Sequence, residues 1–214
     1  MIPVVAIVGR SGSGKTVLME KLIGEMKARG CKVAAVKHAH QKVEMDSPGK
    51  DTWRFSQAGS KATVIASPEL ITIFRNTKAD PGLEDVVRVL GQGYDIILAE
   101  GFKETKYPKI EVHEGKDNAP LFKENELIAI VSDDKIKCKI PRFTRDDIEG
   151  IADFIEKDVI DSTDSDISVT VNGKSIPLMP FVKDIIASSI LGMLSTLKNV
   201  GIIRNVVILI RNKT

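Results

Sequence analysis

Apolar residues are concentrated in short stretches of the first 160 positions, and their spacing predicts buried strands and amphipathic helices. Continuous β-branched runs indicate strands of a parallel sheet, because strands covered on both faces show no polar alternation. Three such runs lie at 3–8 (PVVAIV), 32–37 (KVAAVK) and 94–101 (YDIILAEG). Apolar residues at i, i+3, i+4 and i+7 predict a helix over 17–29 that ends at Gly30. This strand–helix–strand order predicts a parallel βαβ unit with a right-handed crossover.

The alternation of strands and helices continues to residue 160. Further runs with strand character lie at 62–67, 70–75, 109–114 and 127–134. The spacing predicts a helix over 83–90, opened by Asp80-Pro81, and a second helix that ends at Ile160. Thr144 and Asp147 resemble a capping box for this second helix. Residues 1–160 are therefore predicted to form an α/β domain, a mostly parallel sheet flanked by helices.

A polar stretch at 161–166 (DSTDSD) has the composition of a linker, and a different pattern follows it. Asn172-Gly173 predicts a hairpin, and Pro180 predicts the start of a helix of about 18 residues. With a terminal strand at 205–212, residues 167–214 are expected to form a small C-terminal ββαβ module. A module of 48 residues buries little surface alone, so we expect it to pack on the first domain or on a partner chain.

Charge and composition exclude several classes of partner. The formal net charge is +2 and no run of five basic residues occurs, so neither a nucleic acid nor a membrane surface is expected to bind. The apolar run at 185–197 has 13 residues, whereas a membrane span needs about 20. The first residues lack the basic head of a signal peptide, and Cys31 and Cys138 form no CxxC pair. We therefore expect a cytoplasmic protein.

One motif predicts a specific chemistry. Residues 9–16 match the pattern GxxxxGK(S/T) between an apolar strand and an amphipathic helix. Glycines let backbone N–H groups surround phosphate oxygens, Lys15 places its charge on the β- and γ-phosphates, and Thr16 offers its hydroxyl to Mg²⁺. The motif predicts a P-loop NTPase that binds a nucleoside triphosphate with Mg²⁺. The residues expected to contact the nucleotide are Gly9, Ser11, Gly12, Ser13, Gly14, Lys15 and Thr16.

Acidic residues at strand ends are candidates for binding the metal ion and for recognising the base of the nucleotide. Ligands of open α/β sheets bind beyond the carboxyl ends of the strands, so Glu100, which directly follows IILA, is expected at that edge. It would hold a Mg²⁺-bound water or orient an attacking one. Asp95 opens the same strand and is expected to be structural. Asp133 is a candidate acceptor for a guanine ring, although the chain lacks NKxD at that place.

The long connection at 38–55 has no clear structural pattern, which is typical of a functional segment. His38 and His40 alternate after a strand and are a candidate metal pair, without a cysteine or a helical partner to complete a site.

Several motifs together resemble a known family. VKHAH, DSPGKDTWR, AEGFK and PKIEV, with the phosphate loop, are similar to motifs of the molybdopterin-guanine dinucleotide biosynthesis protein B (MobB) family. The likeness covers about residues 3–155, and GKDTWR and EGFK are more discriminating than the phosphate loop. The module at 167–214 lies outside it.

This resemblance implies a P-loop fold of the signal-recognition/MinD-like class. It implies a homodimer that binds GTP and is at most a slow GTPase. It also implies association with the molybdenum cofactor guanylyltransferase, which joins GMP to molybdopterin, and with molybdopterin or its dinucleotide. By position, Asp46 and Glu100 become the candidate catalytic carboxylates and, with Thr16, the candidate metal ligands. The residues of a candidate second binding surface are Lys50, Asp51 and Arg54.

Two other functions remain open on the residues alone. A P-loop kinase would transfer the γ-phosphate to a small metabolite. Such enzymes carry an Arg-rich lid, whereas Arg142 is the single arginine of residues 103–142. A nucleotide-switched adapter would use hydrolysis only to reset itself, with the segment 38–55 ordered by the γ-phosphate.

Overall fold

A computed structural model describes residues 2–39, 48–77, 79–115, 119–161, 167, 169–171, 174–198, 206, 208 and 210. Its contacts divide the chain into two compact units, Ile2–Ile160 and Asp161–Thr214. The phosphate loop lies in the first unit, and each unit is described by itself.

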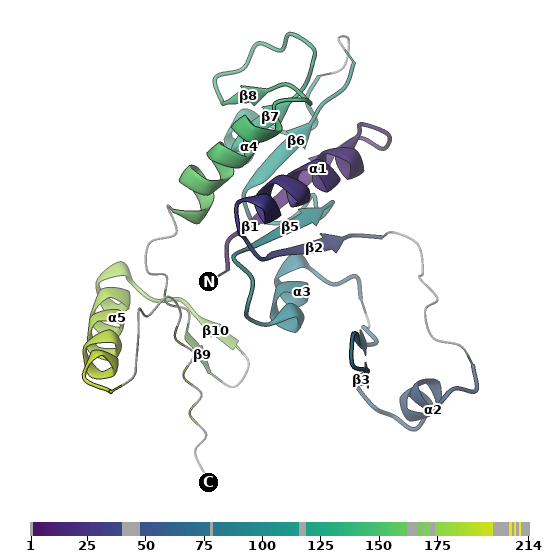
Figure 1. The fold of residues 1–214 in the computed structure, drawn as a ribbon, viewed down its shortest axis with the longest axis vertical. Helices are drawn as coiled ribbons and strands as arrows, with labels where there is room; N and C mark the ends of the chain where they lie inside the picture. The colour runs from purple at the N-terminus through teal and green to yellow at the C-terminus, as the bar shows by residue number, and fades with distance from the viewer. Residues whose placement is uncertain are drawn as a thin grey trace. The chain divides into compact units, whose positions relative to one another are not determined.

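The first unit is built on a parallel sheet (Figure 1). Its six strands are β1 (Val4–Gly9), β2 (Val33–Lys37), β5 (Ile96–Glu100), β6 (Lys109–Val112), β7 (Ala129–Val131) and β8 (Arg142–Phe143). Their spatial order is β2-β5-β1-β6-β7-β8, and every neighbouring pair is parallel. The predicted α/β class with a mostly parallel sheet is confirmed. β1 is buried along its whole length, as its unbroken apolar run requires.

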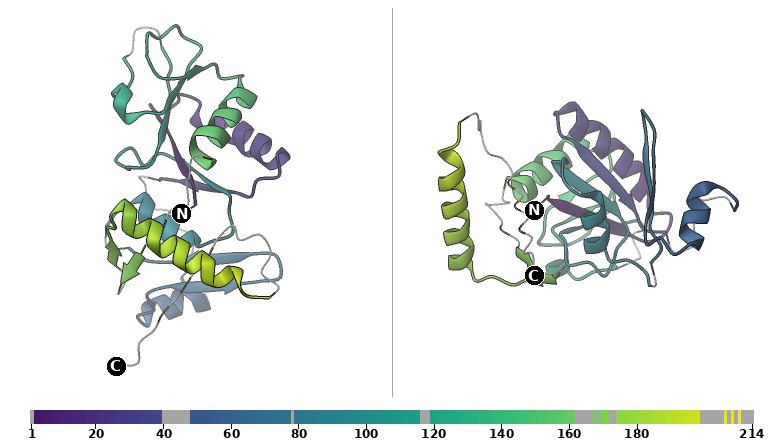
Figure 2. Two further views of the ribbon diagram at one scale, coloured as in Figure 1. Left: turned by 90° about the vertical axis from the view of Figure 1, so that its left-hand side faces the viewer. Right: turned by 90° about the horizontal axis from the view of Figure 1, so that it is seen from below.

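Alternate residues of β1 point to opposite faces of the sheet, and both faces are covered. Val5 and Ile7 pack against α1 (Lys15–Ala28) and α4 (Ile148–Ile155), which lie side by side (Figures 1 and 2). On the other face, Val4 packs with α3 (Leu83–Leu90). Leu22 and Met26 of α1 are fully buried, and each such side chain contributes about 1.5–3 kcal/mol of stability. The sheet and its helices thus hold the start of α1 in a fixed place.

Arg29, at the end of α1, ties this helix to α4 and the residues after it. Its guanidinium donates to Glu25 at 2.8 Å, to Asp153 at 2.7 Å and to Glu156 at 2.7 Å. These three carboxylates raise the pKa of Arg29 above its ordinary value, with the bond to Glu25 as the largest cause. The cluster fixes the far end of the helix whose first residues form the phosphate loop.

The predicted helix ending at Ile160 is present, but its predicted cap is wrong. Asp147, not Thr144, is the N-cap of α4, and its carboxylate accepts a hydrogen bond from the Gly150 N–H at 3.2 Å. Thr144 directly follows β8, a two-residue strand too short to show any periodicity. Residues 144–146 form the turn from β8 into α4, so the helix begins only after them. After Ile155 the helix continues as a π-helical turn to Ile160.

The runs at 62–67 and 70–75 form strands, as predicted, but not in the main sheet. β3 (Thr63–Ala66) and β4 (Ile71–Phe74) pair with each other in an antiparallel hairpin. The connection between them is four residues long, which suits a hairpin, since a parallel crossover needs about a dozen. The short helix α2 (Asp51–Gln57) precedes this hairpin and contacts β3.

The second unit contains the predicted hairpin, formed by β9 (Val169–Val171) and β10 (Lys174–Ile176). α5 (Pro180–Ser195) follows, with Pro180 in the first turn as predicted and a length of 16 residues. None of its residues is buried. The predicted strand at 205–212 falls largely outside the described residues. No helix in the described part of the chain is long and apolar enough to cross a membrane.

Candidate nucleotide site

The phosphate loop runs from the end of β1 to the start of α1, and its shape depends on glycine. Gly9, Gly12 and Gly14 have φ values of 150°, 80° and 84°, which side chains rarely adopt. A Cβ atom at Gly9 would also lie 2.4 Å from the Val112 carbonyl oxygen and 2.8 Å from Ser13 Oγ. β1, β6 and the loop therefore meet too closely at Gly9 for any other residue.

Lys15 and Ser13 present polar groups to the inside of this loop. Lys15 Nζ donates to the carbonyl oxygen of Arg10, within the loop itself. Burial lowers the pKa of Lys15, and the neighbouring charges of Lys103 and Lys37 lower it further, while Glu100 opposes them. Ser13 Oγ is buried and has no hydrogen-bond partner among the described residues. The Ser13 hydroxyl lacks a hydrogen-bond partner, and the Lys15 ammonium group lies near two other cations. An anionic ligand would satisfy both groups.

Thr16 and Glu100 meet beside the loop. β5 is the neighbour of β1, and Glu100 pairs in register with Ile7, which brings its carboxylate to the carboxyl edge. Thr16 Oγ1 donates to Glu100 Oε2 at 2.9 Å, and Lys37 Nζ lies 3.5 Å from Glu100 Oε1. Asp95, at the opposite end of β5, accepts a hydrogen bond from the Lys32 N–H at 2.7 Å, which is a structural role.

A hydroxyl and a carboxylate are oxygen ligands of the kind that Mg²⁺ takes, so this pair fits the ion. No cluster of three or more His, Cys, Asp or Glu side chains with metal-site geometry occurs among the described residues. A metal held here would therefore take its other ligands from phosphate oxygens and water. Asp46, the other predicted carboxylate, lies outside the described residues.

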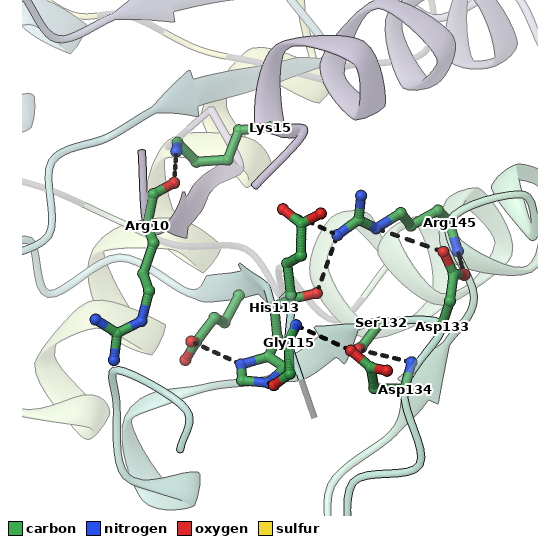
Figure 3. Close-up of polar contacts among 10 residues, drawn as sticks. Arg10, Lys15, His113, Gly115, Ser132, Asp133, Asp134 and Arg145 are labelled. Atoms are coloured by element: carbon green, nitrogen blue, oxygen red, sulfur yellow. Dashed lines mark hydrogen bonds and ion pairs between the residues drawn. The ribbon is translucent and has the colours of Figure 1, made fainter. Parts of the chain in front are cut away.

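The loops that follow β6, β7 and β8 meet at Arg145 (Figure 3). Its backbone N–H donates to Asp133 Oδ1 at 3.0 Å, and its Nε lies 3.6 Å from Asp133 Oδ2. Its Nη2 donates to the carbonyl oxygen of His113 at 3.3 Å and lies 3.8 Å from a Glu114 oxygen. Nη1 lies 3.4 Å from the place that a Cβ on Gly14 would occupy. One guanidinium thus connects three strand-end loops with the phosphate loop.

Asp133 and Asp134 differ in their surroundings. Asp134 faces inward, where its Oδ2 accepts a hydrogen bond from the Gly115 N–H at 2.9 Å. The Asp133 side chain is 62% exposed, so it can still accept bonds from a ligand. Arg145 therefore contacts Asp133 through its backbone N–H and Nε, while its Nη1 approaches Gly14 of the phosphate loop.

Three basic residues of this edge were not predicted. Lys37 ends β2 and Lys103 lies three residues after the end of β5, so the rule that singled out Glu100 applied to them as well. Arg145 was missed because β8 was not recognised as a strand.

The predicted second surface is not brought to the phosphate loop by any described contact. Lys50 is the N-cap of α2, and Asp51 and Arg54 form an exposed ion pair at 3.7 Å on that helix. Of the candidate histidine pair, His38 stacks on Phe102 and its Nε2 lies 2.9 Å from a carboxylate oxygen of Asp80. His40 lies outside the described residues.

A glycine-rich loop between a central parallel strand and a helix, with Lys15, Thr16 and Glu100 at one edge, defines a P-loop nucleotide-binding fold. The family model for molybdopterin guanine dinucleotide synthesis protein B, MobB, matches residues 4–133. The chain belongs to this family.

Curated relatives agree with this assignment. The molybdopterin-guanine dinucleotide biosynthesis adapter protein of Haemophilus influenzae is 36% identical over 157 residues, which cover 72% of this chain and 88% of the relative. A putative adapter protein of the same name from Methanocaldococcus jannaschii is 32% identical over 226 residues and covers 92% of both chains. That second match extends beyond Ile2–Ile160 into the C-terminal unit. The crystal structure of Bacillus subtilis MobB superposes with a TM-score of 0.55 and 25% identity, over 73% of this chain and 98% of that one.

Proposed function

We propose that this chain is a GTP-binding accessory protein of molybdenum cofactor biosynthesis, which assists the transferase that attaches GMP to molybdopterin. The observation that carries the nucleotide part is the Thr16–Glu100 hydrogen bond beside Lys15 at the carboxyl edge of the sheet. The pathway part is supported by family membership and by relatives named as biosynthesis adapter proteins.

In this function Lys15 and the loop N–H groups hold the phosphates, Thr16 and Glu100 hold the metal side, and Asp133 recognises guanine. Hydrolysis is slow at most. Glu100 is the one described carboxylate bonded to the loop hydroxyl, and its other oxygen lies 3.5 Å from Lys37 Nζ, so both of its oxygens already face other groups. Arg142 bonds the Asp134 carbonyl oxygen at 2.8 Å instead of forming part of a lid, so no observation favours the kinase.

Binding of GTP and ATP to the purified full chain, with and without Mg²⁺, tests the nucleotide part. We expect GTP to bind at least about tenfold more tightly than ATP. This factor corresponds to about 1.4 kcal/mol, which hydrogen bonds specific to guanine would contribute. The pathway part is tested by co-purification with the guanylyltransferase, followed by mass identification of retained nucleotide or pterin. Equal affinity for ATP together with no transferase complex would overturn the proposal.

The chain acts as a homodimer in this proposal, and the β3–β4 hairpin supports that state. A two-stranded sheet is marginally stable alone in water. Val64 pairs with Ile73, and Ala66 pairs with Ile71, so these four side chains share one face of the hairpin. Val64, Ile71 and Ile73 are 54%, 68% and 47% exposed. A second copy of the hairpin would cover this apolar face.

We expect Ile71→Asp to shift the chain from dimer to monomer, because a carboxylate on the apolar face would be desolvated in the dimer without a partner. Light scattering coupled to size-exclusion chromatography gives the mass directly. Lys61→Asp, at an exposed position just before β3, is the matched control and should leave the dimer intact. A wild-type monomer, or an unchanged mass for Ile71→Asp, would contradict the proposed dimer.

A further inference from the structure

A cavity of about 630 Å³ lies on the segment that connects β5 to β6. A volume of this size is typical of small-molecule sites. Its lining includes Lys103, Thr105, Lys106, Lys109 and Phe122, together with two acidic residues, Glu104 and Glu126. Lys103 belongs to the EGFK motif and Lys109 to the PKIEV motif. Two motifs that the phosphate loop does not explain therefore meet in one place.

Lys109 is the residue whose position most needs an explanation. It is the first residue of β6, it is only 8% exposed, and its Nζ lies 5.7 Å from the centroid of the Phe122 ring. No ion pair or hydrogen bond joins its ammonium group to any described residue. A buried charge without a counter-charge is costly, so the three N–H donors of Lys109 lack a partner that an anion would supply.

Two of the neighbouring acids, Glu111 and Glu126, already accept backbone hydrogen bonds, and the third, Glu104, is exposed. Glu111, on the same face of β6, accepts hydrogen bonds from the Leu121 N–H at 2.8 Å and the Phe122 N–H at 3.3 Å. These bonds hold Phe122 over Lys109. Glu126 accepts a hydrogen bond from the Lys123 N–H at 3.0 Å. No ion pair joins either of these two carboxylates to Lys109 in the part of the chain that the structure describes.

The other groups in the lining suit a phosphate. Thr105 is buried, and its Oγ1 accepts a hydrogen bond from the Tyr107 N–H at 3.3 Å, which leaves its own O–H free to donate. Lys103 and Lys106 are exposed and supply two more mobile cations. Phe122 offers an apolar surface for the organic part of a ligand.

We propose that this cavity binds the phosphate monoester of a small organic molecule, as a second anionic ligand separate from the nucleotide. Lys109 would be its buried anchor, and Lys103 and Lys106 would close on the phosphate from the solvent side. Lys103 also lies close enough to Lys15 to influence its charge, so the two ligands would be neighbours. The site goes beyond the proposed function and does not depend on which nucleotide the loop prefers.

Pyridoxal 5′-phosphate is a suitable probe, because its aldehyde condenses with a lysine amine, releasing water, and borohydride then reduces the imine to a stable amine. The full-length Lys15→Ala variant is used, so that the phosphate loop offers no lysine. Peptide mass spectrometry locates the label. We expect labelling at Lys103, Lys106 or Lys109 to be at least about tenfold faster than with pyridoxal, because pyridoxal lacks the phosphate that would form charged hydrogen bonds with these lysines.

Lys109→Met should abolish this phosphate-directed preference at Lys103 and Lys106 while the thermal unfolding midpoint stays unchanged or rises. Lys135→Gln, at an exposed position outside the cavity, is the matched control and should keep the preference. Labelling spread evenly over exposed lysines, or equal rates with pyridoxal, would overturn the proposal. Nucleotide binding is measured separately on the wild-type chain. If the chain fails to bind GTP, the labelling experiment therefore still tests the second anion site.

Discussion

Replacing Lys15 with alanine is expected to weaken nucleoside triphosphate binding by roughly 100-fold to 10,000-fold, because about two charge-assisted bonds of 1.5–3 kcal/mol each are lost. The Lys15 ammonium group lies in the loop, where burial and the charges of Lys103 and Lys37 already disfavour its charged form. A triphosphate would relieve that cost. Titration calorimetry with GTP and Mg²⁺ measures the change in dissociation constant.

The fold should survive this substitution. In the described chain Lys15 Nζ bonds only the Arg10 carbonyl oxygen of its own loop, so thermal unfolding without nucleotide is expected to stay the same. Lys21→Ala is the matched control, since it removes the same charge from the same helix and loses only an exposed pair with Asp146. Tight GTP binding by Lys15→Ala would refute the assignment of the phosphate loop.

Replacing Asp133 with asparagine is expected to lower GTP affinity by about 100-fold and to raise affinity for xanthosine triphosphate above it. A carboxylate accepts hydrogen bonds from the two N–H groups on one edge of guanine. An asparagine amide instead donates to the carbonyl that xanthine carries at the same position. Competition of each triphosphate against a fluorescent GTP analogue measures the exchange of preference.

Asp134→Asn is the control that separates recognition from loop structure. Asp134 is adjacent in sequence, but its carboxylate bonds the Gly115 N–H inside the fold. Its substitution should weaken all nucleotides alike and keep the order of preference. If Asp133→Asn changes GTP and ATP affinity by the same factor, Asp133 does not read the base and its role is to hold Arg145.

Long, unbroken patterns were the part of the fold that the sequence predicted well. β1, α1 and β5 carry enough buried positions for strand and helix periods to be told apart, and their register brings Glu100 to Thr16 as the strand-end rule predicts. β8 has two residues, too few to show a strand period in the sequence. Because this strand was not predicted, Arg145, which lies just after it, was not predicted as a site residue either.

Local choices between competing partners were less predictable. Thr144 and Asp147 both have side chains able to cap a helix, and only the path of the chain out of β8 selects Asp147. The runs that became β3 and β4 have ordinary strand composition. Their separation from the main sheet depends on which strands occupy its edges, which no local pattern encodes.

The Thr16–Glu100 hydrogen bond has a consequence for the order in which ligands arrive. The two oxygens already lie together, so little movement is needed when a metal joins them. Free Mg²⁺ would find one hydroxyl and one carboxylate, too few ligands to give up its water. Mg²⁺ already bound to a triphosphate brings phosphate oxygens with it. Association kinetics should therefore follow the concentration of the metal–nucleotide complex and not that of the free ion.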